Sequence, residues 1–367
     1  MGKTVGDCGA FLTPTRDGTD MDESGWATVL GFAGTLVVLS ALVLVVGIDD
    51  TVSALTRADP TALVLVLGIA AVWLTSWGLA LWTILRALNA PIPVHTAVLL
   101  FSGAVFSNNI TPFGQAGGEP LSALLISTAA DSEYETGLAA IASVDTVHFV
   151  PSVGYAIIGF TFVAAGAVRL GRNLLFAAGA VAALAIGLPV AAYLGWRYRY
   201  ELEAAVVSLF TPVIRLLGRI APRRSPPTPQ MIENRIESFF AAIDRVAADR
   251  RTLVQTLGFS AFGWACLAAS LWTSLYAVGF TVPPSTVLLV VPVGSIASLA
   301  PLPGGSGAIE AVLVTLLVST APVPAAAATS AVLIHRSATF LLPTLVGSGV
   351  ATMLGIDRAI ELDQGDD

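Results

Sequence analysis

The sequence predicts an all-α, polytopic membrane protein built from two related halves. Of its 367 residues, 55% are hydrophobic and only 12% are charged, and the mean hydropathy is +0.80. Soluble proteins carry about 25% charged residues, so the apolar segments belong in a bilayer. Two segments rich in Gly and Pro, 111–119 and 301–310, interrupt apolar sequence in each half. We expect about six full spans and two re-entrant helical hairpins that break at these segments.

The first membrane repeat is predicted to occupy residues 26–196. Residues 1–25 are polar and lack the basic start and early apolar core of a signal peptide, so we expect a disordered tail. The inner tryptophans Trp73 and Trp77 are interpreted as packing residues rather than as the wall of a lipid groove. Apolar segments predict full spans near 26–48, 61–85, 137–168 and 174–196, with a broken hairpin near 95–130.

Residues 197–251 are predicted to form a basic, cytoplasmic linker. The linker contains ten Arg against six Asp and Glu. Apolar residues recur at helical spacing from Leu202 to Ile220 and from Ile232 to Val246, which predicts amphipathic helices. Such helices either lie on an anionic membrane surface or pack against the spanning bundle, and the sequence leaves both arrangements open.

The second membrane repeat, 252–354, is predicted to follow the plan of the first. Two full spans are expected near 253–279 and 325–354, and a broken hairpin near 285–320 lies between them. Residues 355–367 form an acidic tail.

An internal duplication is predicted by an offset of 191 residues, which carries position 112 onto position 303. Both broken segments then read P-x-G-x-x-x-x-E, and a charged residue in the following span also aligns. The aligned pairs are Pro112 with Pro303, Gly114 with Gly305, Glu119 with Glu310, and Asp145 with Arg336.

The membrane topology is predicted from the basic linker, because loops rich in Lys and Arg stay in the cytoplasm. Counting spans outward from this linker places both termini in the cytoplasm and opens the two hairpins to opposite sides. The halves are then inverted-topology repeats. Transporters with such repeats bind substrate near the midplane, where the ends of broken helices meet.

A substrate site is therefore predicted where the two breaks meet. A charge inside the membrane is costly unless it meets protein, water or a ligand, which favours function over simple helix capping for the glutamates. Helix N-termini after the breaks suit phosphate. The alternative is that the charged residues only cap helices and neutralise other buried groups. The predicted substrate-binding residues are Glu119, Glu310, Arg336, Asp145, Gln115, Asn109, Thr111 and Ser306. The predicted hairpin breakers are Pro112, Gly114, Gly117, Gly118, Pro301, Pro303, Gly304, Gly305 and Gly307.

Other classes of function lack their sequence signals. Cys8 and Cys266 lie far apart, and His95, His148 and His335 show no metal-ligand spacing. The sequence contains neither a nucleophile elbow nor a nucleotide-binding Gly loop followed by Lys. We therefore expect no enzyme activity, no metal, no cofactor and no nucleic-acid partner.

Three features of the sequence resemble the lysylphosphatidylglycerol synthase transmembrane region, also called the flippase-like domain family. They are P-L-P-G-G-S-G-A-I-E at 301–310, Arg336 in the following helix, and T-P-F-G-Q-A-G-G-E-P at 111–120. The resemblance covers about residues 26–354 and implies a domain that moves lipids or lipid-linked sugars between leaflets. In bifunctional bacterial members it carries aminoacylated phosphatidylglycerol outward. In some archaeal members it accompanies a glycosyltransferase domain that uses dolichol-phosphate sugars. We expect a stand-alone version here.

The resulting prediction is a cell-membrane lipid translocase that moves a phospholipid or polyprenyl-linked glycolipid headgroup through a polar midplane cavity. Its expected partners are anionic, aminoacylated or polyprenyl-linked lipids, and a partner enzyme or a homo-oligomer is compatible with the sequence. Two alternatives stay open. One is an ion-coupled secondary transporter of small solutes, and the other is a non-catalytic scaffold for a partner glycosyltransferase or synthase.

Overall fold

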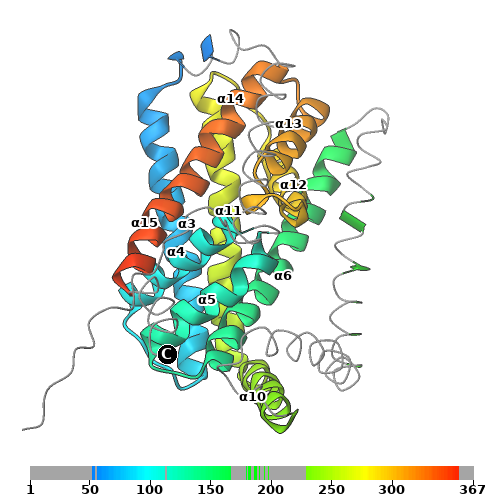
Figure 1. Ribbon diagram of the computed structural model, residues 1–367. Helices are drawn as coiled ribbons and strands as arrows, with labels where there is room; N and C mark the ends of the chain where they lie inside the picture. Colours follow the sequence, from blue (N-terminus) through cyan, green and yellow to red (C-terminus); the bar gives the residue numbers. More distant parts are fainter. Residues whose placement is uncertain are drawn as a thin grey trace, which may run out of the picture.

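In the computed structural model the chain forms a helical bundle (Figure 1). The structure describes residues 52–53, 56–111, 114–166, isolated positions between 179 and 197, and 229–354. Five helices in these parts are long and apolar enough to cross a membrane. The predicted class of all-α polytopic membrane protein is therefore confirmed. Both tails, the predicted span at 26–48, most of that at 174–196 and the Leu202–Ile220 series lie outside the described residues.

Two long helices, α3 (Pro60–Ala87) and α11 (Arg250–Ala277), occupy the centre of the bundle. Each has 28 residues, or about 42 Å at 1.5 Å per residue, which exceeds the hydrocarbon thickness of about 30 Å. Asp59 and Asp249 cap their N-termini by accepting a backbone N–H two residues further on. The Asp59 N–H donates to the Ala277 carbonyl over 3.0 Å, so the two helices run antiparallel.

Both central helices end in the same turn. Asn89 after α3 and Gly279 after α11 have positive φ values of 59° and 86°. The next residue of each donates its N–H to a carbonyl five residues back, at 2.9 and 3.0 Å. A tryptophan hydrogen bond also closes each turn. The indole N–H of Trp82 donates to the Ile92 carbonyl over 3.1 Å, and that of Trp272 donates to the Val282 carbonyl over 3.0 Å. These matched turns, 190 residues apart, support the duplication.

In inverted-topology repeats, equivalent helices of the two halves run in opposite directions. The antiparallel helices α3 and α11, one from each half, have this arrangement. The inverted relation of the complete halves stays a prediction, because the described residues contain too few helices of the first half. The domain limits at 26–196 and 252–354 stay predictions for the same reason.

Each break separates two short helices, as predicted. In the first hairpin these are α4 (Val94–Ile110) and α5 (Gln115–Ala130), and in the second they are α12 (Pro284–Ser295) and α13 (Ala308–Thr320). Their lengths of 12 to 17 residues correspond to roughly 18–26 Å, which is less than a bilayer core. Counted from Pro303, the segment that contains α13 has 18 residues and is the shortest of the five candidate spans.

Glycines with positive φ make the breaks. Gly114 has φ 52°, and Gly304, Gly305 and Gly307 have φ 57°, 62° and 87°, a region that residues with a Cβ rarely adopt. The second break also contains two 3₁₀ turns, η2 (Ile296–Leu299) and η3 (Pro303–Gly305).

The prediction that Gly117 and Gly118 break the first hairpin is wrong, because both lie inside α5. Gly118 instead permits close helix packing, since a Cβ at this position would lie 2.6 Å from the Asn108 backbone nitrogen on α4. Of the predicted breakers, Pro303 opens η3 and Pro301 lies just before it, whereas Pro112 lies outside the described residues.

Two further long apolar segments complete the described bundle. The first, α6 (Tyr134–Gly166), has 33 residues. The second runs through α14 (Ala325–Arg336), the π-helical turn η4 (Ser337–Leu341) and α15 (Leu342–Met353). Both match predicted spans, and the π-helical turn lies directly after Arg336.

The described helix of the linker, α10 (Pro229–Ala248), packs against the bundle through its C-terminal half. Ala242 and Val246 are buried there, and Phe239 and Ile243 pack against the main core. This observation favours the packed arrangement of the two that the sequence left open.

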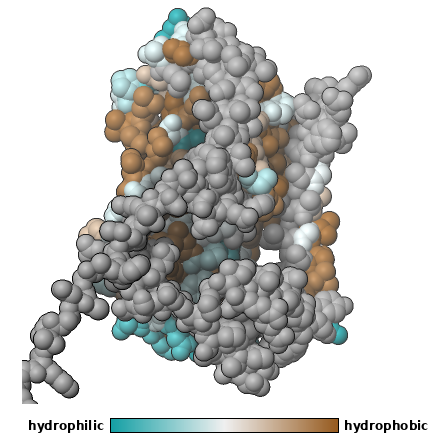
Figure 2. Space-filling view, viewed as in Figure 1, coloured by the Kyte–Doolittle hydropathy of each residue, from teal (hydrophilic) through white to brown (hydrophobic). Residues whose placement is uncertain are grey.

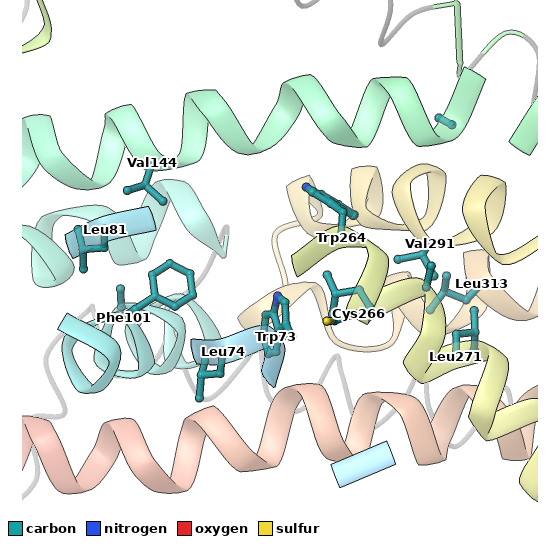
Figure 3. Close-up of a cluster of buried hydrophobic side chains, with 14 of the residues drawn as sticks. Trp73, Leu74, Leu81, Phe101, Val144, Trp264, Cys266, Leu271, Val291 and Leu313 are labelled. Carbon is teal, nitrogen blue, oxygen red and sulfur yellow. The ribbon is translucent and has the colours of Figure 1, made fainter. Parts of the chain in front are cut away.

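One hydrophobic core joins the two halves, and Figure 3 shows side chains from both, with Trp73 of the first half next to Cys266 of the second. Large apolar side chains are also exposed on the outside, for example Val64, Phe162 and Leu345. Figure 2 shows apolar surface (brown) between hydrophilic residues (teal) near both ends of the described helices. This distribution fits a protein that is surrounded by lipid.

Candidate functional site

A cavity of about 450 Å³ lies between the two halves. The central helices contribute Trp73, Trp77 and Trp264 to its wall, and the broken ends of both hairpins contribute Gln115 and Gly304. Its volume lies within the range of small-ligand pockets. The cavity therefore lies where the sequence predicts a site, between the ends of broken helices.

Arg336, the last residue of α14, brings a positive charge to the cavity wall. Its Nε donates a hydrogen bond to Oε1 of Glu310 over 2.7 Å, and Nη2 donates to the Gly304 carbonyl over 3.4 Å. The guanidinium also lies 5.4 Å from the centre of the Phe340 ring. These contacts fix the orientation of the side chain.

Glu310 holds this arginine and caps a helix at the same time. It is the third residue of α13, and its Oε2 accepts the Gly307 N–H over 2.5 Å. The side chain of Glu310 is only 6% exposed and that of Arg336 is 15% exposed. Glu310 is not part of the cavity wall, so it acts on the cavity through Arg336.

Asp145 of α6 brings a carboxyl group to the cavity wall. The residue is 8% exposed, and its Oδ2 has no hydrogen-bond partner among the described residues. Gln115, at the start of α5, lines the same cavity wall. The ion pair of Arg336 is with Glu310, so in the described part of the chain Asp145 has no cationic partner.

His148 lies one helical turn after Asp145 and also lines the cavity. Its Nδ1 is 2.7 Å from Oγ of Ser260 on α11, and its ring stacks on Trp77 with 4.0 Å between ring centres. The Nε2 atom is buried and has no partner among the described residues. A second histidine, His335, lines the cavity from α14.

The other predicted residues differ in their positions. Asn109 lines the cavity and donates to Oγ1 of Thr344 over 2.9 Å, which ties the first hairpin to α15. Thr111 donates to the Ser107 carbonyl at the end of α4. The cavity wall includes Asp145, Arg336, Gln115 and Asn109, but not Glu119, Glu310, Thr111 or Ser306. Contact of any of these residues with a ligand stays a prediction.

Glu119 and Glu310 occupy different helical positions, although the sequence aligns them. Glu310 is the third residue of its helix, whereas Glu119 is the fifth of α5 and is half-buried. A fifth residue lies beyond the first turn and does not reach the free N–H groups at the helix start.

Seven aromatic or imidazole residues of the wall were not predicted to belong to the site: Trp73, Trp77, Phe101, His148, Phe149, Trp264 and His335. The tryptophans do pack, as the sequence suggests, but they also form one side of the cavity. The signal available in the sequence was the spacing of three residues between Asp145 and His148, which places both on one helix face. In the described part of the chain, no three His, Cys, Asp or Glu side chains form a group that could hold a metal ion.

Comparison with known proteins identifies related membrane proteins. The family model for the lysylphosphatidylglycerol synthase transmembrane region matches residues 29–347. The chain is 28% identical over 339 residues to a UPF0104 membrane protein of Methanothermobacter thermautotrophicus, covering 91% of this chain and 95% of that protein. It is 24% identical over 309 residues to a UPF0104 membrane protein of Pyrococcus horikoshii, covering 82% and 89%. It is also 25% identical over 361 residues to glycosyltransferase AglD of Haloferax volcanii, covering 90% of this chain but 55% of that protein.

Proposed function

This chain belongs to the family of the lysylphosphatidylglycerol synthase transmembrane region, and from that premise we propose that it moves lipid headgroups between the leaflets of the cell membrane. The substrate is a phospholipid or a polyprenyl-linked glycolipid, and both termini face the cytoplasm. The headgroup passes through the cavity while its hydrocarbon chains stay in the bilayer. Translocation, rather than covalent chemistry, is the proposed activity.

The observation that carries this proposal is the cavity between the two hairpins, with Arg336 held in its wall by Glu310. A guanidinium has five N–H donors in a planar fork that matches phosphate oxygens. Glu310 and the Gly304 carbonyl accept from Nε and Nη2. The other Arg336 donors form no hydrogen bond with described residues, so they are available to a headgroup phosphate.

The rest of the cavity wall suits passage better than tight binding. Most of its residues are aromatic or aliphatic, among them Trp73, Phe101, Ile141 and Leu313. A transport site must bind its cargo strongly enough to admit it and weakly enough to release it. One oriented cation in a mostly apolar wall provides a single strong contact for the phosphate.

An ion-coupled transporter of small solutes is the second candidate. Asp145, which is buried and has no cationic partner among the described residues, is the type of intramembrane carboxylate that couples transport to protons or sodium. The two candidates differ in what passes through the cavity, and the assay below separates them.

The proposal predicts lipid flipping in vesicles that contain the purified protein. Headgroup-labelled lipids are incorporated in both leaflets, and a membrane-impermeant quencher is added outside. Without flipping, only outer-leaflet label is quenched; with the protein, we expect inner-leaflet label to be quenched as well. The assay is run separately with anionic, aminoacylated and polyprenyl-linked lipids.

The matched control is Thr146→Ala, since Thr146 is exposed on α6 and bonds only within its own helix. This variant should flip lipid like the wild type. Folded protein that flips none of the three lipid classes contradicts the proposal, and uptake of solute by the same vesicles would then favour the second candidate.

A further inference from the structure

Two residues of the cavity wall, Asp145 and His148, each have a buried polar atom without a hydrogen-bond partner among the described residues. These atoms are Oδ2 of Asp145 and Nε2 of His148. Both residues are at most 8% exposed. Because they are three residues apart on α6, they share one face of the helix.

Nothing in the described part of the chain neutralises Asp145 as an anion. The arginine of the cavity, Arg336, already pairs with Glu310 at 2.7 Å. A carboxylate buried without a cation is costly, and protonation removes its charge. The unused oxygen of Asp145 therefore marks it as a group that gains and loses a proton rather than as half of a structural ion pair.

His148 is held in place by its other atoms. Ser260 binds Nδ1 at 2.7 Å, Trp264 donates its indole N–H to the His148 carbonyl at 2.8 Å, and Trp77 stacks on the ring. The ring is thus oriented with one nitrogen bonded and the other unused.

The first hairpin places a more exposed carboxylate on a helix beside this pair. Gln115 of α5 lines the same cavity wall as Asp145, and α5 packs against α6. Gln115 and Glu119 are four residues apart, so they lie on one face of that helix. Glu119 is only half-buried, whereas Asp145 is buried.

The remaining ionisable groups around the pair are few. Among the helices that pack against α6, α3, α11 and α12 contribute no charged or histidine side chain to the cavity wall, and α5 contributes Gln115. The wall also includes His335 and Arg336 of α14, and α4 adds no charged or histidine side chain to it. The described ionisable residues of α10 are not part of the wall: Glu237, Asp244 and Arg245.

We propose that Asp145 and His148 form a proton-binding pair, that Glu119 and Gln115 connect it to water, and that proton movement through the pair drives the translocation of the headgroup. Oδ2 of Asp145 takes a proton from water at one face and becomes a neutral acid. Release of that proton to water at the other face, directly or through Nε2 of His148, restores the carboxylate. No bond of the lipid is made or broken. The inference rests on the proposed function and names its source of energy.

The test compares lipid distribution in vesicles with and without a pH gradient. If one proton moves with each lipid, each pH unit drives up to about a tenfold asymmetry of labelled lipid between leaflets. We expect the wild type to show asymmetry that reverses when the gradient is inverted. Asp145→Asn and His148→Gln should show none, and Thr146→Ala should behave like the wild type.

Each outcome has a separate meaning. Flipping without any response to the gradient overturns proton coupling but leaves the proposed function intact. Absence of flipping in both conditions overturns the proposed function and the coupling that rests on it. Equal gradient responses in Asp145→Asn and wild type overturn the assignment of the pair.

An infrared measurement on purified protein keeps the assignment testable if Asp145→Asn does not flip lipid. Wild-type protein should show the carbonyl stretch of a buried protonated carboxylic acid. The intensity of this band should grow as the pH is lowered, its frequency should fall on transfer to heavy water, and Asp145→Asn should lack it. An identical spectrum in wild type and variant at every pH would show that Asp145 does not take up a proton.

Discussion

Arg336→Met should abolish lipid flipping and strongly destabilise the protein. Arg336 is the partner of a buried carboxylate, since Glu310 is 4% exposed and its Oε1 lies 2.7 Å from Nε. Removing one member of a buried ion pair costs about 3–5 kcal/mol, because the other charge is left uncompensated. The free energy of unfolding, measured by thermal or denaturant unfolding in detergent, should fall by an amount in this range.

A double variant separates the structural role of the pair from its transport role. In Glu310→Gln/Arg336→Met no charge remains to be compensated, and the amide oxygen of the substituted side chain still accepts the Gly307 N–H at the start of α13. We expect most of the lost stability to return, since a buried pair is often replaceable by neutral groups. Flipping should stay absent because no cation faces the phosphate. If the double variant flips lipid at the wild-type rate, the headgroup does not depend on Arg336.

The second large effect is expected for Gly118→Ala. A Cβ on Gly118 would lie 2.6 Å from the backbone nitrogen and 2.7 Å from the Cα of Asn108, distances at which α4 and α5 must separate. Overpacking costs typically about 1–3 kcal/mol, and more where backbone has to move. Because Asn108 lines the cavity, we expect loss of flipping together with reduced thermal stability.

Gly154→Ala is the matched control for this change. Gly154 lies inside α6, and a Cβ there meets nothing within 4 Å. Alanine is a better helix former than glycine by about 1 kcal/mol, so this variant should be as stable as the wild type or more stable, with normal flipping. If Gly118→Ala matches Gly154→Ala in both measurements, close contact between α4 and α5 is not needed.

Much of the architecture was predictable because its causes are local. The apolar segments that became α3 and α11 are long enough to span, and their aspartate caps and terminal turns set their ends. The breaks at Gly114 and at Gly304–Gly307 follow from residues that tolerate positive φ. The helical position of Gly118 was not predictable, since a glycine inside a membrane helix and a glycine in a turn look alike in sequence.

The pairing of charges depends on packing rather than on sequence spacing. The repeat aligns Asp145 with Arg336 and Glu119 with Glu310, so one aligned pair has opposite charges and the other has the same charge. The structure instead pairs Arg336 with Glu310 inside the second half and leaves Asp145 without a cationic partner among the described residues. The residue types explain this asymmetry, because Arg336 and Glu310 carry opposite charges whereas Asp145 and Glu119 are both acidic. The helix starts differ as well, since α5 begins four residues before Glu119 and α13 only two before Glu310.

The central claim, that the lipid headgroup passes through this cavity, is tested most directly by blocking it. A cysteine is introduced at Ser295, which lines the cavity, in a background with Cys8→Ser and Cys266→Ser. The same cysteine at Thr315, exposed on α13, is the control. Both variants are modified with a bulky thiol reagent, and intact mass confirms complete labelling.

Lipid flipping is then measured before and after modification. We predict that modification at Ser295→Cys reduces flipping to the rate of protein-free vesicles, whereas modification at Thr315→Cys leaves it unchanged. Flipping that continues at the unmodified rate with the reagent attached at position 295 would contradict the account, because the headgroup would then cross by another route.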